Sequence, residues 1–157
     1  MARPPRPPRP PRPPRPQGGT VTGSLVLDAE GLVKLAAGDP RAAYPFEAIR
    51  RRRGRVVTAA STLTEVLRGG QRDVPVHRIL GKVSIVPISA ERARAAGELL
   101  GRTGLSGHRC ALDALLATVA LDQPRPVVLL TSDVRDLARL TEEPELPRQE
   151  RIAVVRV

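Results

Sequence analysis

Residues 24–38 read SLVLDAEGLVKLAAG, and the rest of the chain repeats the pattern that this stretch sets. Its first part, SLVLD, is a short run of apolar residues that ends in an acid, which is typical of a strand buried on both faces. Its second part, AEGLVKLAAG, spaces its apolar residues as a helix does and ends in glycine. A strand followed at once by a helix is the unit from which parallel sheets are built.

The same alternation continues to the end of the chain. Further strands are expected at RVVTAA, VSIVPIS, PVVLLTSD and RIAVVRV, which begin at residues 55, 83, 126 and 151. Helices are expected between them, at residues 41–53 with a bend or break at Pro45, then at 61–70, 74–80, 90–104, 110–121 and 134–141. We therefore predict an α/β fold for residues 24–157, a three-layer α/β/α domain with a mostly parallel sheet of about five strands.

Residues 1–19 differ from this pattern, because they form an Arg-Pro-Pro repeat with five arginines, no acids and nine of the 17 prolines. Proline at two of every three positions prevents helices and sheet ladders, so we expect a disordered Arg/Pro-rich tail. Of the net charge of +10, this tail carries +5 and residues 20–157 carry +5. The tail is either a stripe of arginines that meets an anionic surface or a leader without a role.

Composition excludes several classes of protein. A single cysteine, Cys110, excludes an internal disulfide framework and a cysteine-based zinc site. The longest apolar run, CALDALLATVAL (110–121), is interrupted by Asp113 and is too short to span a membrane. The N-terminus has no apolar signal segment, so a cytoplasmic protein without membrane association is expected.

Four acids recur at or just after the ends of the expected strands and within the helices. Asp28 ends the first strand, Glu65 lies one turn into the helix after the second, and Asp133 ends the fourth. Ligands bind at the carboxyl edge of a parallel sheet, so acids there can converge on one crevice. Asp113 interrupts an otherwise apolar helix, where a buried carboxylate needs a partner.

Each of the strand-end acids also has a purely structural alternative. Asp28 and Asp133 can each cap the helix that follows, and Glu65 can complete a capping box with Thr62. These local roles and a shared chemical role are both open at this point.

The order of the acids resembles the PIN domain, the nuclease fold of VapC-type toxins. The resemblance is carried by LVLDAEGLVKL (25–35), LTEVLRG (63–69), ALDALLATVA (111–120) and LLTSDVRDLARL (129–140), and it covers residues 24–157. It implies a catalytic quartet of Asp28, Glu65, Asp113 and Asp133. The three aspartates are metal ligands in this assignment, and Glu65 is either a further ligand or the group that orients water. It also implies supporting positions, which are Thr131, Ser132 and Asp136.

The resemblance implies a metal-dependent endoribonuclease that hydrolyses RNA phosphodiester bonds, the toxin of a VapBC-type pair. The implied partners are RNA, an antitoxin of VapB type and, in a homodimer, a second copy of the chain. Four carboxylates in one crevice repel each other unless a cation compensates them. Hard oxygen ligands select Mg²⁺ or Mn²⁺, and such an ion lowers the pKa of an attacking water.

A carboxylate site repels a polyanion, so RNA affinity must come from arginines. One group of candidates is the cluster of Arg50, Arg51, Arg52, Arg53 and Arg55. The other group lies close in sequence to the acids and consists of Arg68, Arg72, Arg109 and Arg135. The RRRRGR run is either a phosphate-binding cluster or a solvated helix end. His108 is either an RNA contact or an ordinary loop histidine. Tyr44 and Phe46 are the only aromatic residues, so we expect RNA to be bound by its backbone and shape.

Two other functions compete with the nuclease. One is a non-catalytic PIN-like scaffold that binds nucleic acid or protein. The other is a phosphatase of the haloacid dehalogenase type, because LVLDAEG resembles the opening D-x-D-G motif of that family. Against the phosphatase, Glu30 stands in place of the second Asp, and neither Lys34 nor Lys82 stands where that chemistry needs a lysine.

Overall fold

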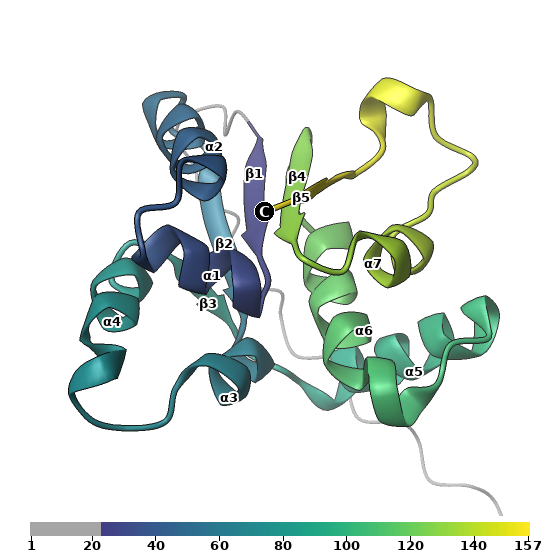
Figure 1. Cartoon of the computed structure of the whole chain (residues 1–157). Helices are drawn as coiled ribbons and strands as arrows, with labels where there is room; N and C mark the ends of the chain where they lie inside the picture. Colours follow the sequence, from purple (N-terminus) through teal and green to yellow (C-terminus); the bar gives the residue numbers. More distant parts are fainter. Residues whose placement is uncertain (1–22) are drawn as a thin grey trace, which may run out of the picture.

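The computed structural model describes residues 23–157 and shows a five-stranded parallel sheet between two layers of helices (Figure 1). The strands lie in the order β3-β2-β1-β4-β5. Their bounds are β1 Ser24–Leu27, β2 Arg55–Ala59, β3 Ser84–Val86, β4 Val127–Thr131 and β5 Ala153–Arg156. The three-layer α/β/α prediction is confirmed, and every strand pair is parallel. The tail of residues 1–19 lies outside the described residues.

The helices divide between the two faces of the sheet (Figure 1). One face carries α1 Ala29–Ala36, α2 Pro40–Arg51 and α4 Val74–Leu80, and the other carries α5 Ala90–Thr103, α6 Gly107–Leu121 and α7 Val134–Leu140. The short α3, Leu63–Val66, follows a 3-10 turn at Ala60–Thr62, and further 3-10 turns lie at Gln71–Asp73 and Arg148–Glu150. None of the helices within residues 23–157 is both long and apolar enough to span a membrane.

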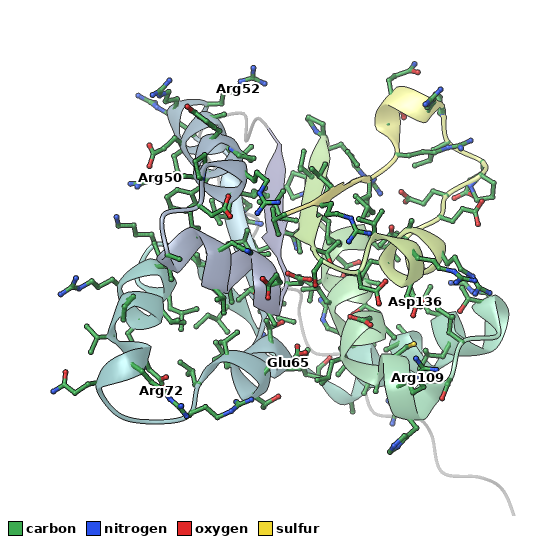
Figure 2. The ribbon with its side chains drawn as sticks, in the orientation of Figure 1. Arg50, Arg52, Glu65, Arg72, Arg109 and Asp136 are labelled. Carbon is green, nitrogen blue, oxygen red and sulfur yellow. The ribbon has the colours of Figure 1, made fainter. Side chains whose placement is uncertain are left out.

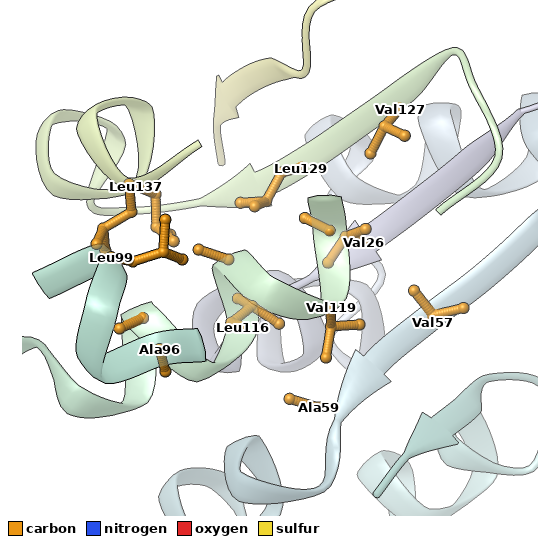
Figure 3. Packing of buried hydrophobic residues seen from close by; sticks show 14 residues of the cluster. Val26, Val57, Ala59, Ala96, Leu99, Leu116, Val119, Val127, Leu129 and Leu137 are labelled. Carbon is orange, nitrogen blue, oxygen red and sulfur yellow. The ribbon is translucent and has the colours of Figure 1, made fainter. Parts of the chain in front are cut away.

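Alternate residues of β1 supply the two halves of the core. Leu25 and Leu27 pack with α1 and α2 on one face, whereas Val26 packs with α6 on the other. Figure 3 shows Val26 among Leu116 and Val119 of α6. Because both faces of the strand are covered, every residue of β1 is buried, which explains its continuous apolar run.

The helix does not break at Pro45, because α2 continues from Pro40 through Arg51. Pro45 is the sixth residue of this helix, so its missing N–H removes one hydrogen bond from the second turn. Burial of Ala42 and Phe46 against the sheet keeps the helix continuous.

The helix expected over residues 61–70 is much shorter than predicted. Gly69 and Gly70 adopt positive φ angles of 83° and 93°, and they turn the chain away from α3. The buried Asp73 holds this turn, because its Oδ2 accepts the N–H groups of Arg68 and Gly69 at 2.8 and 2.6 Å. The loop expected before residue 110 is instead the first turn of α6, which kinks at Cys110.

The end of α2 is stabilised by two hydrogen bonds but contains an unfavourable backbone conformation. The N–H groups of Arg53 and Gly54 bond to the carbonyls of Arg50 and Ile49, each at 2.9 Å. In this motif the residue after the cap has a positive φ and is usually glycine. Gly104 fills that position after α5, but Arg53 fills it here with a φ of 55°.

We expect Arg53→Gly to stabilise the protein, because glycine adopts this conformation without the cost that a Cβ adds. A gain of about 0.5–1 kcal/mol is expected, which raises the melting temperature by about 1–4 °C in a domain of this size. Thermal unfolding followed by circular dichroism measures it.

Arg51→Gly is the matched control, because Arg51 belongs to the right-handed last turn of α2. There glycine is expected to cost about 1 kcal/mol. Equal destabilisation by the two glycines would contradict the account of Arg53.

Candidate active site

A cavity of about 240 Å³ lies beyond the carboxyl ends of β1 and β4. The sheet grows outward in opposite directions from these two strands, and this reversal is where open parallel sheets form their binding crevice. The cavity is lined by Asp28, Ala29, Glu30, Thr62, Glu65, Leu112, Asp113, Leu116, Ser132 and Asp133. The structure therefore brings all four predicted acids to one place, although they lie far apart in the sequence.

Asp28 and Asp133 each cap a helix as well as line the cavity. Oδ1 of Asp28 accepts the N–H of Gly31 at 2.6 Å, at the start of α1. Oδ1 of Asp133 accepts the N–H of Asp136 at 3.2 Å, at the start of α7. The sequence suggested that Asp133 ends the fourth strand, but β4 ends at Thr131 and Asp133 lies just after it. Capping therefore does not exclude a shared role, because it fixes each carboxylate at the mouth of the cavity.

Glu65, in contrast, has no local structural role. Thr62 is buried and makes no capping hydrogen bond with its side chain, so the alternative of a capping box is wrong. The Thr64 hydroxyl donates to the Ser61 carbonyl instead, at 2.7 Å. The Glu65 side chain is left exposed on the rim of the cavity, at the carboxyl end of the sheet (Figure 2).

Asp113 reaches the cavity from α6 and is partly buried. Burial, and after it the negative charges of nearby acids, together raise its pKa from 3.8 to about 6. These acids are Asp133, Glu65, Asp28 and Asp136. This carboxylate is therefore close to half protonated near pH 6. The contribution of the neighbouring acids shows that the four carboxylates interact through the cavity.

Two more acids have raised pKa values for related reasons. Burial raises the pKa of Asp28, although hydrogen bonds from Gly31, Thr131 and Ser132 oppose this. Partial burial, followed by the charge of Asp28, raises the pKa of Glu65. The site thus holds negative charge at a cost in free energy.

No cation of the described chain offsets this cost. Within residues 23–157, none of the four acids forms an ion pair with a lysine or arginine. The nearby Glu30 differs, because it pairs with Lys34 at 3.7 Å. The uncompensated carboxylates make the cavity attractive to a cation from solution.

The set of donor atoms suits a hard divalent cation more than zinc. The cavity is lined by carboxylates and hydroxyls, without Cys or His. Across residues 23–157, no three His, Cys, Asp or Glu side chains are close enough together to hold a metal ion directly. Mg²⁺ usually keeps several of its waters and binds through one or two carboxylates. The residues therefore fit an ion that is held partly through water.

Among the supporting positions, Thr131 is the most closely integrated. It is fully buried, its Oγ1 accepts the N–H of Asp133 at 2.9 Å, and its hydroxyl bonds to Asp28. It thereby links the two capping acids. Ser132 lines the cavity, whereas Asp136 lies outside the lining and accepts a weak bond from the Cys110 thiol at 3.6 Å.

Two polar residues of the lining, Glu30 and Thr62, are not among the predicted site residues. Glu30 follows Asp28 by two residues, and this spacing entered the sequence analysis only through the phosphatase motif. Thr62 was considered only as a helix cap. The contact of either residue with the cavity depends on the packing of α1 and the 3-10 turn, which has no sequence signature.

The predicted RNA-binding arginines separate into two groups in space. Arg68, Arg72, Arg109 and Arg135 are exposed and lie on the carboxyl side of the sheet, in the first turns of α6 and α7 or in the segment after α3. The Arg68 guanidinium donates to the carbonyls of Thr64 and Leu67. Arg50, Arg51, Arg52 and Arg53 lie at the opposite end of the sheet (Figure 2). His108 is exposed in the first turn of α6, and neither it nor any arginine lines the cavity.

Comparisons with known proteins agree with this geometry. The family model of the PIN domain matches residues 25–143. No curated protein matches the chain in sequence.

Solved structures share the fold at low sequence identity. VapBC2 from Rickettsia felis, bound to a DNA fragment from its promoter, aligns with a TM-score of 0.59 and 18% identity over 85% of this chain and 98% of that chain. A toxin-antitoxin complex from Klebsiella pneumoniae aligns with a TM-score of 0.55 and 22% identity over 73% and 90%. FitAB bound to an IR36 DNA fragment aligns with a TM-score of 0.58 and 15% identity over 84% and 94%.

The raised pKa of Asp113 predicts a pH-dependent loss of stability in the metal-free protein. A carboxyl group whose pKa is higher in the folded state stabilises the fold below its unfolded pKa, and this contribution is lost as the pH rises through about 6. The shift corresponds to at most about 3 kcal/mol, and solvent screening of a partly exposed side chain reduces this to about 1–2 kcal/mol. Asp113→Asn should therefore be more stable than the wild type at pH 7.5, by about that amount, and about equally stable at pH 4.

Urea unfolding in a chelating buffer at both pH values measures the difference. Asp122→Asn is the control, because Asp122 caps the other end of α6 and pairs with Arg92 at 2.9 Å. A variant Asp113→Asn that is less stable than the wild type at pH 7.5 would contradict the electrostatic account of the site.

Proposed function

The chain belongs to the PIN domain family, and from this premise we propose that it is a metal-dependent endoribonuclease that acts as the toxin of a toxin-antitoxin pair. The observation that carries the proposal is the convergence of four acids, without a basic partner among residues 23–157, on a cavity at the switch point of the sheet. PIN domains are generally nucleases. A phosphodiester is the substrate that such a site serves best once a cation is bound.

Asp28, Asp113 and Asp133 are proposed to hold Mg²⁺ or Mn²⁺. Such an ion, when bound, would neutralise charge on the scissile phosphate and lower the pKa of an attacking water. The ligands must be deprotonated to bind it, and the pKa of Asp113, raised to about 6, makes that step sensitive to pH near neutrality. Burial also raises the pKa of Asp28.

Glu65 is proposed to orient the water and accept its proton. Its carboxylate lies on the rim of the cavity, free of any capping bond, and its pKa is raised toward the range that suits a general base. Thr131 is a positioning residue in this scheme, because it links Asp28 to the backbone of Asp133. Hydrolysis in this way would leave a 5′-phosphate and a 3′-hydroxyl.

Substrate strands are proposed to cross the carboxyl edge of the sheet. Arg109 and Arg135 are exposed there and can contact phosphates that flank the site, as can Arg68 and Arg72 on the other side. These contacts offset the repulsion between the acids and the RNA backbone.

The toxin assignment rests on the three structural neighbours, which are VapBC2, a toxin-antitoxin complex and FitAB. By analogy we propose that this chain pairs with a small antitoxin of VapB type and that two copies of the chain can associate. An acidic segment of the antitoxin would suit the basic surface of this chain. A short reading frame that overlaps the start of the gene would supply this partner for direct binding measurements.

Asp28→Asn is expected to lower the rate of Mg²⁺-dependent RNA cleavage by about 100-fold or more, because general acid–base and metal-site groups contribute at least that factor. Asp113→Asn and Glu65→Gln are expected to behave similarly. Cleavage of a structured RNA by the full chain, followed by gel electrophoresis with and without a chelator, measures the loss.

Asp122→Asn serves as the matched control here too, since it removes a carboxylate from α6 outside the cavity. It should cut at the wild-type rate. If the wild-type chain binds RNA but cuts none with Mg²⁺ or Mn²⁺, the protein is the non-catalytic scaffold and the nuclease proposal is wrong.

A further inference from the structure

Five exposed arginines form a basic patch at the end of the molecule opposite the acidic cavity. They are Arg50, Arg51, Arg52, Arg53 and Arg55, at the end of α2 and the start of β2. Figure 2 shows Arg50 and Arg52 at one end of the sheet and Glu65 at the other. The residues of β2 from Arg55 to Ala59 span about 13 Å, and the cavity lies beyond Ala59.

Three of the five side chains in this patch are not held by other described residues. The side chains of Arg51, Arg53 and Arg55 make no ion pair or hydrogen bond with another residue in the range 23–157. Glu47 is the sole acid on α2 and pairs with none of them. Cations near the last turn of a helix offset its dipole, but that effect reaches only the last turn and leaves Arg53 and Arg55 without this role.

Arg53 occupies a position where glycine would cost the fold less. Its positive φ contrasts with Gly104, which fills the same position after α5. A long cationic side chain is thus present at this position despite the backbone cost. A binding role accounts for its presence where local stability does not.

Tyr44 adds a stacking surface beside the arginines. It lies on α2, two turns before Arg51 and on the same face of the helix, and it is 76% exposed. The other aromatic residue, Phe46, is buried beneath the guanidinium of Arg50, 5.4 Å from it. Tyr44 is therefore available for an unpaired base to stack on, in addition to the backbone contacts that the sequence predicts.

Gly23, the first residue that the structure describes, lies beside the patch. Its carbonyl accepts the N–H of Arg55 at 3.0 Å.

We propose that the basic patch and Tyr44 form an anchoring site for single-stranded RNA, separate from the cleavage site. Arg51, Arg53 and Arg55 contact phosphates, and Tyr44 stacks on one base. The patch lies farther from the cavity than the Debye length of about 8 Å, so it acts by touching RNA outside the cleavage site and not through its field. That the anchored RNA is then cut rests on the proposed function.

Binding is measured by fluorescence anisotropy with a labelled single-stranded RNA of about 20 nucleotides, within the range of site sizes for such proteins. The full chain carries Asp113→Asn in every sample, and a chelator prevents cleavage. Arg51→Gln combined with Arg53→Gln is expected to weaken binding about 10-fold and to reduce the slope of log affinity against log salt by about 1.4. Arg94→Gln combined with Arg102→Gln, which removes two exposed arginines from α5, should change affinity less than about 2-fold.

Tyr44 tests whether a base is bound. Tyr44→Ala should weaken binding of the single strand about 5-fold or more, which is the lower end of the range for one stacked base. Tyr44→Phe should restore it. Neither variant should alter binding of an RNA duplex, whose bases are not available for stacking.

Arg53→Gly separates binding from folding, because it should weaken RNA binding while raising the melting temperature. Cleavage by chains with an intact acidic site gives a further readout. A dinucleotide is too short to occupy the cavity and also contact the patch at the other end of β2, about 13 Å away. The double arginine variant should therefore cut a dinucleotide as the wild type does and cut the longer RNA less efficiently.

Equal losses in the patch variant and the α5 control would overturn the proposal. A second contradictory result has two parts. The chain would bind anionic lipid vesicles or duplex DNA as tightly as single-stranded RNA, and Tyr44→Ala would have no effect. The patch would then be a general surface for polyanions. If the wild type cuts no RNA but the patch variants still lose affinity, the proposed nuclease fails and the anchoring site stands.

Discussion

The parallel pairing of β1 with β4 is the constraint on which the site depends. Leu27 lies opposite Leu130 in this pair, and the N–H of Asp28 bonds to the Leu130 carbonyl at 3.2 Å. Two segments about a hundred residues apart in the sequence therefore end at the same edge. The buried Thr131 then connects Asp28 to the backbone of Asp133. The parallel pairing of β2 with β1 brings the turn that leads to Glu65 to the same edge.

The consequence of that convergence is an electrostatic conflict built into the fold. Burial and like charge raise the pKa of Asp113 to about 6, and the same causes raise the pKa of Asp28 and Glu65. A protein under selection for stability alone would place a cation or apolar residues there. In the proposed function a divalent ion would offset this charge, and arginines elsewhere on the surface would hold the RNA.

Much of the fold and the acidic site could be predicted from the sequence, because both depend on local patterns. Buried strands appear as continuous apolar runs, and acids directly after them must lie at one edge of a parallel sheet. Features set by packing could not be predicted. The sequence could not show that Pro45 is tolerated within α2, that Asp73 shortens the helix containing Glu65, or that Thr62 is buried without a capping bond. Nor could it show that the RRRRGR run lies at the far end of β2 and that Tyr44 is exposed beside it.

The central proposal is that Asp28, Asp113 and Asp133 hold a divalent cation, and direct titration of Mn²⁺ into the metal-free chain by calorimetry tests it most directly. At pH 6 the account predicts saturable binding with release of protons, because Asp113 is partly protonated there and must ionise to act as a ligand. It also predicts that Asp113→Asn weakens the binding and abolishes most of the proton release. Binding that is absent at millimolar Mn²⁺, or that is unchanged in Asp113→Asn, would contradict the account.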